Sequence, residues 1–264
     1  MASYTAKDVA ALRQMTGAGM LDCKNALEEA GGDMEEAAKQ LRLKGLAGAA
    51  KRSDREAVEG AVAAVRSGDA AAVVELRCET DFVAKAEDFV ALAHELATLV
   101  AAKGEEAVAE LDDEVDRLRT TLKENISVGR VRRLVAQPGQ VVDTYLHQQA
   151  GRGVNAVAVV LEGGSEELAH DIAVHIAFAR PAYLSRGEVP EAEVAAERAT
   201  LEEISRNEGK PEAALEKIVE GRLTGWFKER VLLDQAYVRD EKQSVAKMLG
   251  SARIVSFAQV VVGD

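Results

Sequence analysis

The sequence predicts an α+β fold, divided into a small helical module, a core of strands and helices, and a helical hairpin that projects from the core. Three observations lead to this prediction. Helical apolar spacing fills residues 1–54, strand patterns with turn signals begin near residue 60, and helical spacing returns over residues 190–231. A chain of 264 residues also exceeds the usual size of one hydrophobic core, so we expect two or more domains.

Residues 1–54 are expected to form a compact bundle of three short helices. Thr5 is placed to cap the first helix, and Asp33 is placed to cap the third. The second helix runs from about Met20 to the Gly31-Gly32 pair, which ends it. So short a bundle has only a small core.

Charge separates this module from the rest of the chain. Residues 1–54 carry eight basic and eight acidic side chains, so the whole net charge of −12 belongs to the remainder. This step predicts a domain boundary near residue 54, with Lys51 to Asp54 as a linker. The negative net charge also argues against nucleic acid as a direct partner, because nucleic-acid binders usually gain affinity from clustered Lys and Arg.

The core is expected to begin with a β-hairpin. Residues 60–65 and 71–79 read as strands on either side of Ser67-Gly68-Asp69, which is a hairpin turn signal. In the second strand, apolar side chains alternate with charged ones, which predicts one buried face and one wet face. The buried set is Val74, Leu76 and Cys78, and the wet set is Glu75, Arg77 and Glu79.

Further elements of the core follow from the same kinds of pattern. Pro138-Gly139 is a type II turn pair between two strands, and residues 154–161 are nearly all apolar, as in a strand covered on both faces. The expected helices cover residues 87–102, 112–125, 165–178 and 241–249, and the expected strands cover residues 128–136, 141–147, 154–161 and 252–262.

The projecting hairpin is predicted from two helical stretches around Gly209-Lys210-Pro211. Apolar residues fall at helical spacing before and after this break, which indicates two antiparallel helices that pack on each other. These residues are Val194, Leu201 and Ile204 on the first helix and Leu215, Val219, Leu223, Trp226 and Phe227 on the second.

Composition excludes several classes of protein. No apolar run approaches the roughly 18 residues that cross a bilayer, and the N-terminus lacks the basic start and apolar stretch of a signal peptide. The chain is therefore expected in the cytoplasm without a membrane partner. Cys23 and Cys78 are too far apart in sequence for a CxxC redox or zinc pair, and we expect both to be reduced and half-buried.

The sequence offers no pattern for covalent chemistry. The four histidines, His94, His147, His170 and His175, belong to no metal-binding or hydrolase motif, and no phosphate-binding loop is present. We therefore expect a protein that binds another protein, is not an enzyme, and uses no cofactor or metal.

Two stretches suggest binding surfaces, each with a simpler alternative. Met20-Leu21 open a helix after a Gly-Ala-Gly loop, where apolar side chains either face outward or fill the small core. Thr80-Asp81-Phe82-Val83 lie where a buried strand leaves the sheet. Thr80 reads as a helix cap, while Phe82 is either a core residue or an interface anchor on a rigid corner.

These same stretches carry a family resemblance that covers essentially the whole chain. The opening resembles the N-terminal module of bacterial elongation factor Ts in the run TAKDVAALRQMTGAGMLDCKNALEEAGGDMEEAAKQLR. A core motif of that family is similar to CETDFVAKAEDF at residues 78–89. The segments VEGRL, VAKML and VSFAQVVVGD also look like that family.

The resemblance implies an architecture. It consists of a ubiquitin-associated-like three-helix module over residues 1–54 and a two-lobed α+β core with antiparallel sheets. The first lobe covers residues 55–139 and the second covers residues 140–264, with a coiled-coil hairpin inserted at about 188–230. It also implies a guanine-nucleotide exchange factor for elongation factor Tu, the GTPase that carries aminoacyl-tRNA to the ribosome.

The resemblance further implies roles for single residues. The Asp81-Phe82 pair would push against the GTPase near its nucleotide site and dislodge Mg²⁺, with Thr80 and Val83 shaping the corner. The resemblance also implies partner contacts at Arg13, Met20 and Leu21 on the module and at His147 on the second lobe.

Two alternatives stay open at this point. A ubiquitin-associated-type adaptor would use the Gly-Ala-Gly-Met loop for another partner and would leave Asp81 and Phe82 without a role. An RNA-binding or ribosome-associated protein is disfavoured by the negative charge and by an aromatic content of only 4%. The sequence also leaves open whether the helical hairpin joins two copies into a homodimer.

Overall fold

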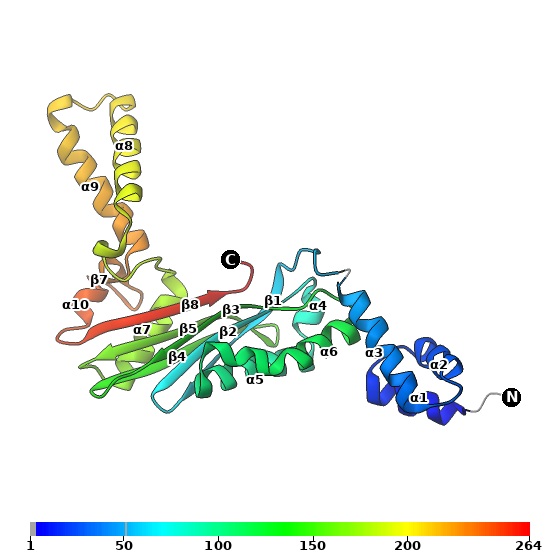
Figure 1. The fold of residues 1–264 in the computed structure, drawn as a ribbon. Coiled ribbons are helices and arrows are strands. Elements are labelled where there is room, and N and C mark those ends of the chain that lie inside the picture. Colours follow the sequence, from blue (N-terminus) through cyan, green and yellow to red (C-terminus); the bar gives the residue numbers. More distant parts are fainter. Residues whose placement is uncertain (1–3, 51) are drawn as a thin grey trace.

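The computed structural model describes residues 4–50 and 52–264, apart from the side chains of residues 46, 47, 49 and 50. Figure 1 shows an elongated molecule with a helical module at one end, sheets in the middle and a helical hairpin that stands off the other end. This confirms the predicted α+β class. Residue 51 of the predicted linker lies outside the described part.

The N-terminal module consists of α1 (Ala6–Thr16), α2 (Met20–Glu29) and α3 (Met34–Ala50). The predicted caps are present. The Thr5 hydroxyl and the Asp8 carboxylate form a reciprocal capping box, and the Asp33 carboxylate accepts bonds from two backbone N–H groups at the start of α3. Its separate core includes Val9, Leu12, Cys23, Ala26, Leu27, Ala37 and Leu41.

The core contains two antiparallel sheets that pack face to face within the described residues. One has the order β1 (Glu59–Ser67), β2 (Ala70–Cys78), β3 (Ser127–Val135), and the other has the order β4 (Gln140–Gln149), β5 (Arg152–Glu162), β8 (Arg253–Val261). The chain passes from one sheet to the other at Pro138-Gly139, where Gly139 has the positive φ of 85° that a type II turn requires. Between the sheets lie Val62, Val73, Val142, Ala158, Val160 and Val260.

Helices cover the outer faces of both sheets. The helix α5 (Glu87–Lys103) buries its apolar side against the first sheet. A 3-10 helix (Glu105–Leu111) joins it to α6 (Asp112–Leu122), which packs beside α5 and adds Val115 and Leu118 to the same core. The helix α7 (Glu166–Ala179) covers the second sheet, so β5 is buried on both faces as its sequence predicts. The core is thus layered as helix, sheet, sheet and helix.

The helical hairpin is formed by α8 (Glu191–Asn207) and α9 (Glu212–Arg230). It stands away from the sheets in Figure 1, as predicted. Leu215, Val219, Leu223 and Phe227 are buried on α9. Part of its acidic surface is neutralised between the two helices, because Arg198 pairs with Glu220 and Arg222 pairs with Glu208.

Two predictions about local structure were wrong. Residues 241–249 are not one helix, because β7 (Asp240–Ser244) pairs with β6 (Ala236–Tyr237) before the single-turn helix α10 (Val245–Met248) begins. The two cysteines are fully buried rather than half-buried, since Cys23 fills the module core and Cys78 fills the first core lobe. Short 3-10 helices at Arg186–Glu188 and Leu232–Asp234 flank the hairpin.

The charged face of β2 is also less wet than predicted, since Arg77 and Glu79 are only partly exposed and Glu75 is buried. Glu75 is only 1% exposed, because the second sheet covers this face of β2. Its carboxylate lies 2.9 Å from the Arg77 guanidinium and 3.5 Å from that of Arg130. A carboxylate taken out of water in this way needs such partners, because an unpaired buried charge is strongly destabilising.

His175 is buried and hydrogen-bonded through both ring nitrogens, so we expect the stability of the fold to depend on pH. Its Nδ1 accepts a bond from the Val238 backbone N–H at 3.2 Å, and its Nε2 donates to the Gln235 amide oxygen at 3.1 Å. Burial lowers the pKa of His175, so the folded state holds the neutral ring. The unfolded chain binds this proton below about pH 6.5, and the stability that depends on the neutral ring is therefore lost as the pH falls.

The measurement is the free energy of unfolding in urea between pH 7.5 and 5.5. Replacing His175 by Asn should remove a slope of at most about 1.4 kcal/mol per pH unit. The variant His94→Asn, at an exposed position of α5, is the matched control for replacing one histidine by Asn. An unchanged slope in His175→Asn would contradict this role.

Candidate partner-binding site

The first candidate surface is the corner where β2 leaves the sheet and α4 (Asp81–Ala84) begins. Thr80 caps α4 as predicted, because its hydroxyl oxygen accepts a bond from the Val83 N–H at 3.4 Å. Val83 and Ala84 are buried and fasten the short helix to the core. Phe82 points the other way and is 84% exposed, so the alternative that it fills the core is wrong.

Asp81 adds a negative charge beside this aromatic ring. Its carboxylate lies 2.6 Å from the Lys85 ammonium, one turn further along the chain. The hydrogen bond from Lys85 lowers the pKa of Asp81, so the group stays ionised at neutral pH. The corner therefore presents an exposed apolar ring together with a half-exposed carboxylate.

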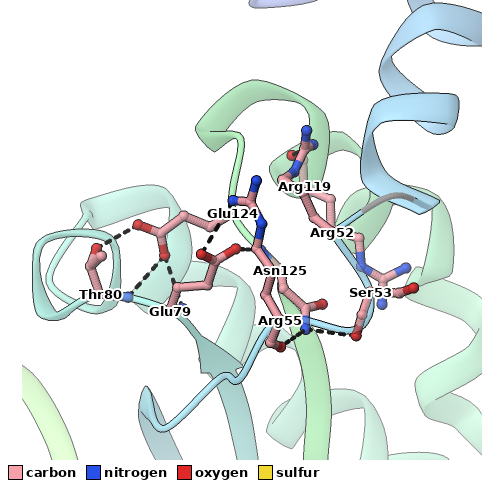
Figure 2. Close-up of polar contacts among 8 residues, drawn as sticks. All are labelled: Arg52, Ser53, Arg55, Glu79, Thr80, Arg119, Glu124 and Asn125. Carbon is pink, nitrogen blue, oxygen red and sulfur yellow. Dashed lines mark hydrogen bonds and ion pairs between the residues drawn. The ribbon is translucent and has the colours of Figure 1, made fainter.

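The start of the corner is stabilised by hydrogen bonds to the side chain of Glu124, which no pattern in the sequence indicated. The Glu124 carboxylate accepts bonds from the backbone N–H groups of Glu79 and Thr80, each at 3.0 Å, and from the Thr80 hydroxyl. Figure 2 shows Glu124 reaching from the turn after α6 to the end of β2. The Cys78 thiol donates to the Thr80 carbonyl at 3.2 Å, and burial raises the pKa of this thiol to about 12.

The same turn is bonded to the linker that follows the N-terminal module. The Asn125 side-chain amide donates to the carbonyls of Ser53 and Arg55 at 3.1 and 2.7 Å. Its backbone N–H donates to the Glu79 carboxylate at 2.7 Å, and the Arg55 guanidinium lies 3.4 Å from that carboxylate. Residues from the linker, β2 and the turn after α6 thus meet beside the corner (Figure 2).

The second candidate surface lies on the module. Met20 is 50% exposed and Leu21 is 69% exposed, so both side chains protrude rather than fill the module core. They line a shallow depression together with Tyr4 and Val9. Arg13 is exposed on α1 but does not line this depression.

The third candidate surface lies on the second core lobe. His147 is exposed on β4, and its Nδ1 lies 3.5 Å from the Tyr145 hydroxyl. It borders a hollow with Arg152 and with Phe178, which is 75% exposed at the end of α7. Phe178 ends the helix predicted over residues 165–178, and no pattern in the sequence marks its ring as a surface feature.

Within residues 4–50 and 52–264, no group of three or more His, Cys, Asp or Glu side chains is arranged to hold a metal ion. None of the helices in that part of the chain is long and apolar enough to cross a membrane.

Comparison with known proteins identifies the family. The elongation factor Ts family model matches residues 79–264. Elongation factor Ts of Clavibacter michiganensis is 49% identical over 277 aligned residues, which cover 100% of both chains. This chain belongs to the elongation factor Ts family. The elongation factors Ts of Renibacterium salmoninarum and Kineococcus radiotolerans are 47% and 44% identical, again over 100% of both chains.

Membership of the elongation factor Ts family confirms the resemblance and assigns the chain a role in translation elongation. The aligned relatives include the N-terminal module, which the family model does not cover. What the sequence did not reveal is the support of the corner. Glu124 and Asn125 lie more than 40 residues from the TDFV motif, and only the folded chain brings them to it.

Proposed function

We propose that this chain binds elongation factor Tu in its GDP-bound state, dislodges Mg²⁺ and promotes release of GDP and its exchange for GTP. The observation that carries the proposal is Phe82, an aromatic ring that is 84% exposed on a corner anchored by a buried strand. A large apolar side chain exposed on an anchored backbone is suited to act as an interface anchor, because little backbone conformational entropy is lost when it binds.

Exchange by this route needs only differential binding. A chain that binds the metal-free, distorted nucleotide site more tightly than the loaded site must weaken nucleotide affinity by the same factor. In this proposal, Asp81 and Phe82 act at that site, while Thr80 and Val83 shape the corner. No acid, base or nucleophile takes part, and the chain acts as a binding partner rather than as an enzyme.

Contacts away from the corner would hold the partner in place. We assign Arg13, Met20 and Leu21 on the module to the GTPase domain of elongation factor Tu, and His147 on the second lobe to another of its domains. Exposure of all four residues supports these assignments. Separate contacts joined in one chain raise the affinity through effective concentration, without any single contact being strong.

The reciprocity of coupling supplies the test. Calorimetry should show that the chain binds nucleotide-free elongation factor Tu more tightly than elongation factor Tu with GDP and Mg²⁺. The ratio of these two affinities should equal the factor by which the chain weakens the binding of GDP to elongation factor Tu. The chain alone should bind neither GDP nor GTP. Equal affinity for the empty and the loaded GTPase, or tight binding of nucleotide to the isolated chain, would contradict the proposal.

A further inference from the structure

We infer that Glu124 is a positioning residue for the exchange corner, an inference that rests on the proposed function. Glu124 does not belong to the corner motif and lies in the turn after α6. Its carboxylate nevertheless accepts bonds from two backbone N–H groups and one hydroxyl at the start of the corner. It would act on the partner only through the orientation that it imposes on Phe82.

The geometry forms a relay from Glu124 to the first turn of α4. The Thr80 hydroxyl donates its proton to Glu124 and accepts the Val83 N–H at 3.4 Å. Because a hydroxyl has one proton and two lone pairs, the bond to Glu124 turns the lone pairs toward Val83. The cap that starts α4, and therefore the direction of Phe82, depends on the carboxylate below it.

A carboxylate is better suited to this position than a neutral side chain. Both of its oxygens accept, and hydrogen bonds to an ionised acceptor are shorter and roughly twice as strong as neutral ones. The two backbone N–H groups at the end of β2 also find their partner here. With only four residues in α4, intrahelical bonds alone would hold the corner weakly.

Asn125, the next residue, extends this support to the linker. Its backbone N–H bonds to Glu79, and its side chain bonds to the carbonyls of Ser53 and Arg55. The turn at residues 124–125 therefore holds the corner on one side and the chain that leads to the module on the other. Lys123, which ends α6 with a positive φ of 59°, turns the chain so that both side chains reach their partners.

The test measures release of a fluorescent GDP from elongation factor Tu over a range of chain concentrations. Glu124→Ala should lower the maximal rate by about ten- to a hundredfold, the range for one hydrogen bond to a charged group. Glu124→Gln, which keeps one accepting oxygen, should fall between Ala and wild type. The half-saturating concentration should stay near the wild-type value, because the module and the second lobe still bind. The matched control is Glu110→Gln, which breaks a surface ion pair with Lys103 and should exchange normally.

A double variant separates positioning from a general loss of stability. If Glu124 acts through Phe82, then Glu124→Ala should slow exchange little further when Phe82→Ala is already present. The inference would be overturned if Glu124→Ala had the wild-type maximal rate, or if it slowed exchange by the same factor in the Phe82→Ala background as in the wild-type chain. It would also be overturned if the lower rate were explained by thermal unfolding of the variant at the assay temperature. Normal exchange by Phe82→Ala alone would instead refute the proposed function of the corner.

Discussion

Replacing Phe82 by Ala should slow GDP release from elongation factor Tu by roughly one and a half to three decades while leaving the melting temperature nearly unchanged. The expected loss corresponds to about 2 to 4 kcal/mol, the range for a buried aromatic hot spot at an interface. Stability should not suffer, because Phe82 is 84% exposed and its removal opens no cavity. The measurement pairs stopped-flow release of fluorescent GDP with thermal unfolding of the same variant.

Phe89 provides the contrasting control. It is fully buried on α5, within the core below the corner, so Phe89→Ala should destabilise the fold by about 3 to 5 kcal/mol. If Phe82→Ala behaved like Phe89→Ala, the exchange defect would reflect unfolding. If it exchanged GDP at the wild-type rate, the corner would not be the working site.

Removing residues 1–50 should leave a folded core and should raise the dissociation rate of the complex with elongation factor Tu by roughly a hundredfold or more. The module has its own small apolar core, and the apolar cores of the two sheets contain none of the described residues of the module, although α3 packs along α6 and Arg42 pairs with Asp113 there. Losing one of several linked contacts removes its avidity, which typically amounts to about 10² to 10⁴. Association should slow much less, because affinity differences of this kind appear mainly in dissociation.

The end point of this truncation follows from the contacts of the linker. Arg52 donates to the Arg119 carbonyl at 3.0 Å, and Asn125 holds the carbonyls of Ser53 and Arg55. Cutting before residue 51 keeps the residues that make these bonds, and it removes the packing of α3 on α6 with the ion pair from Arg42 to Asp113. A Leu21→Ala variant of the full chain should show a smaller rise in dissociation rate. Aggregation of the truncated core, or an unchanged dissociation rate, would show that the module and the core do not act as separate contacts.

Local signals in the sequence predicted most of the elements because each signal acts over a few residues. The capping residues Thr5 and Asp33, the hairpin turn at Gly68-Asp69 and the Pro138-Gly139 turn all have the predicted roles. The length of the helix predicted over residues 241–249 was wrong, because the structure there depends on pairing with another segment. The strand at residues 240–244 is stabilised by pairing with the two-residue strand β6, and so short a partner leaves no readable pattern.

Packing between sheets was harder to predict. The charged residues of β2 suggested a wet face, yet Ala71 and Val73 share that face with Glu75 and face the second sheet. Alternation along one strand reports which side chains share a face but does not report what covers it. Only the folded arrangement showed that a carboxylate is buried there with two guanidinium groups.

The sequence predicted the position of the candidate site but not the contacts that support it. The TDFV motif predicted the corner, but the residues around it did not decide whether Phe82 is buried in the core or exposed on the surface. Exposure decides that question, and it depends on the direction in which α4 leaves the sheet. Glu124 sets this direction from a turn more than 40 residues away, so no spacing rule could have indicated it.

The most direct test of the proposed exchange activity uses this chain at a molar concentration far below that of elongation factor Tu. Elongation factor Tu is loaded with fluorescent GDP in the presence of Mg²⁺, mixed with excess unlabelled nucleotide and a small fraction of the chain, and followed by stopped-flow fluorescence. If the chain is an exchange factor, each copy should release GDP from many copies of the GTPase, and the rate should rise in proportion to the chain added. A release rate identical to that of elongation factor Tu alone would contradict the proposed exchange activity.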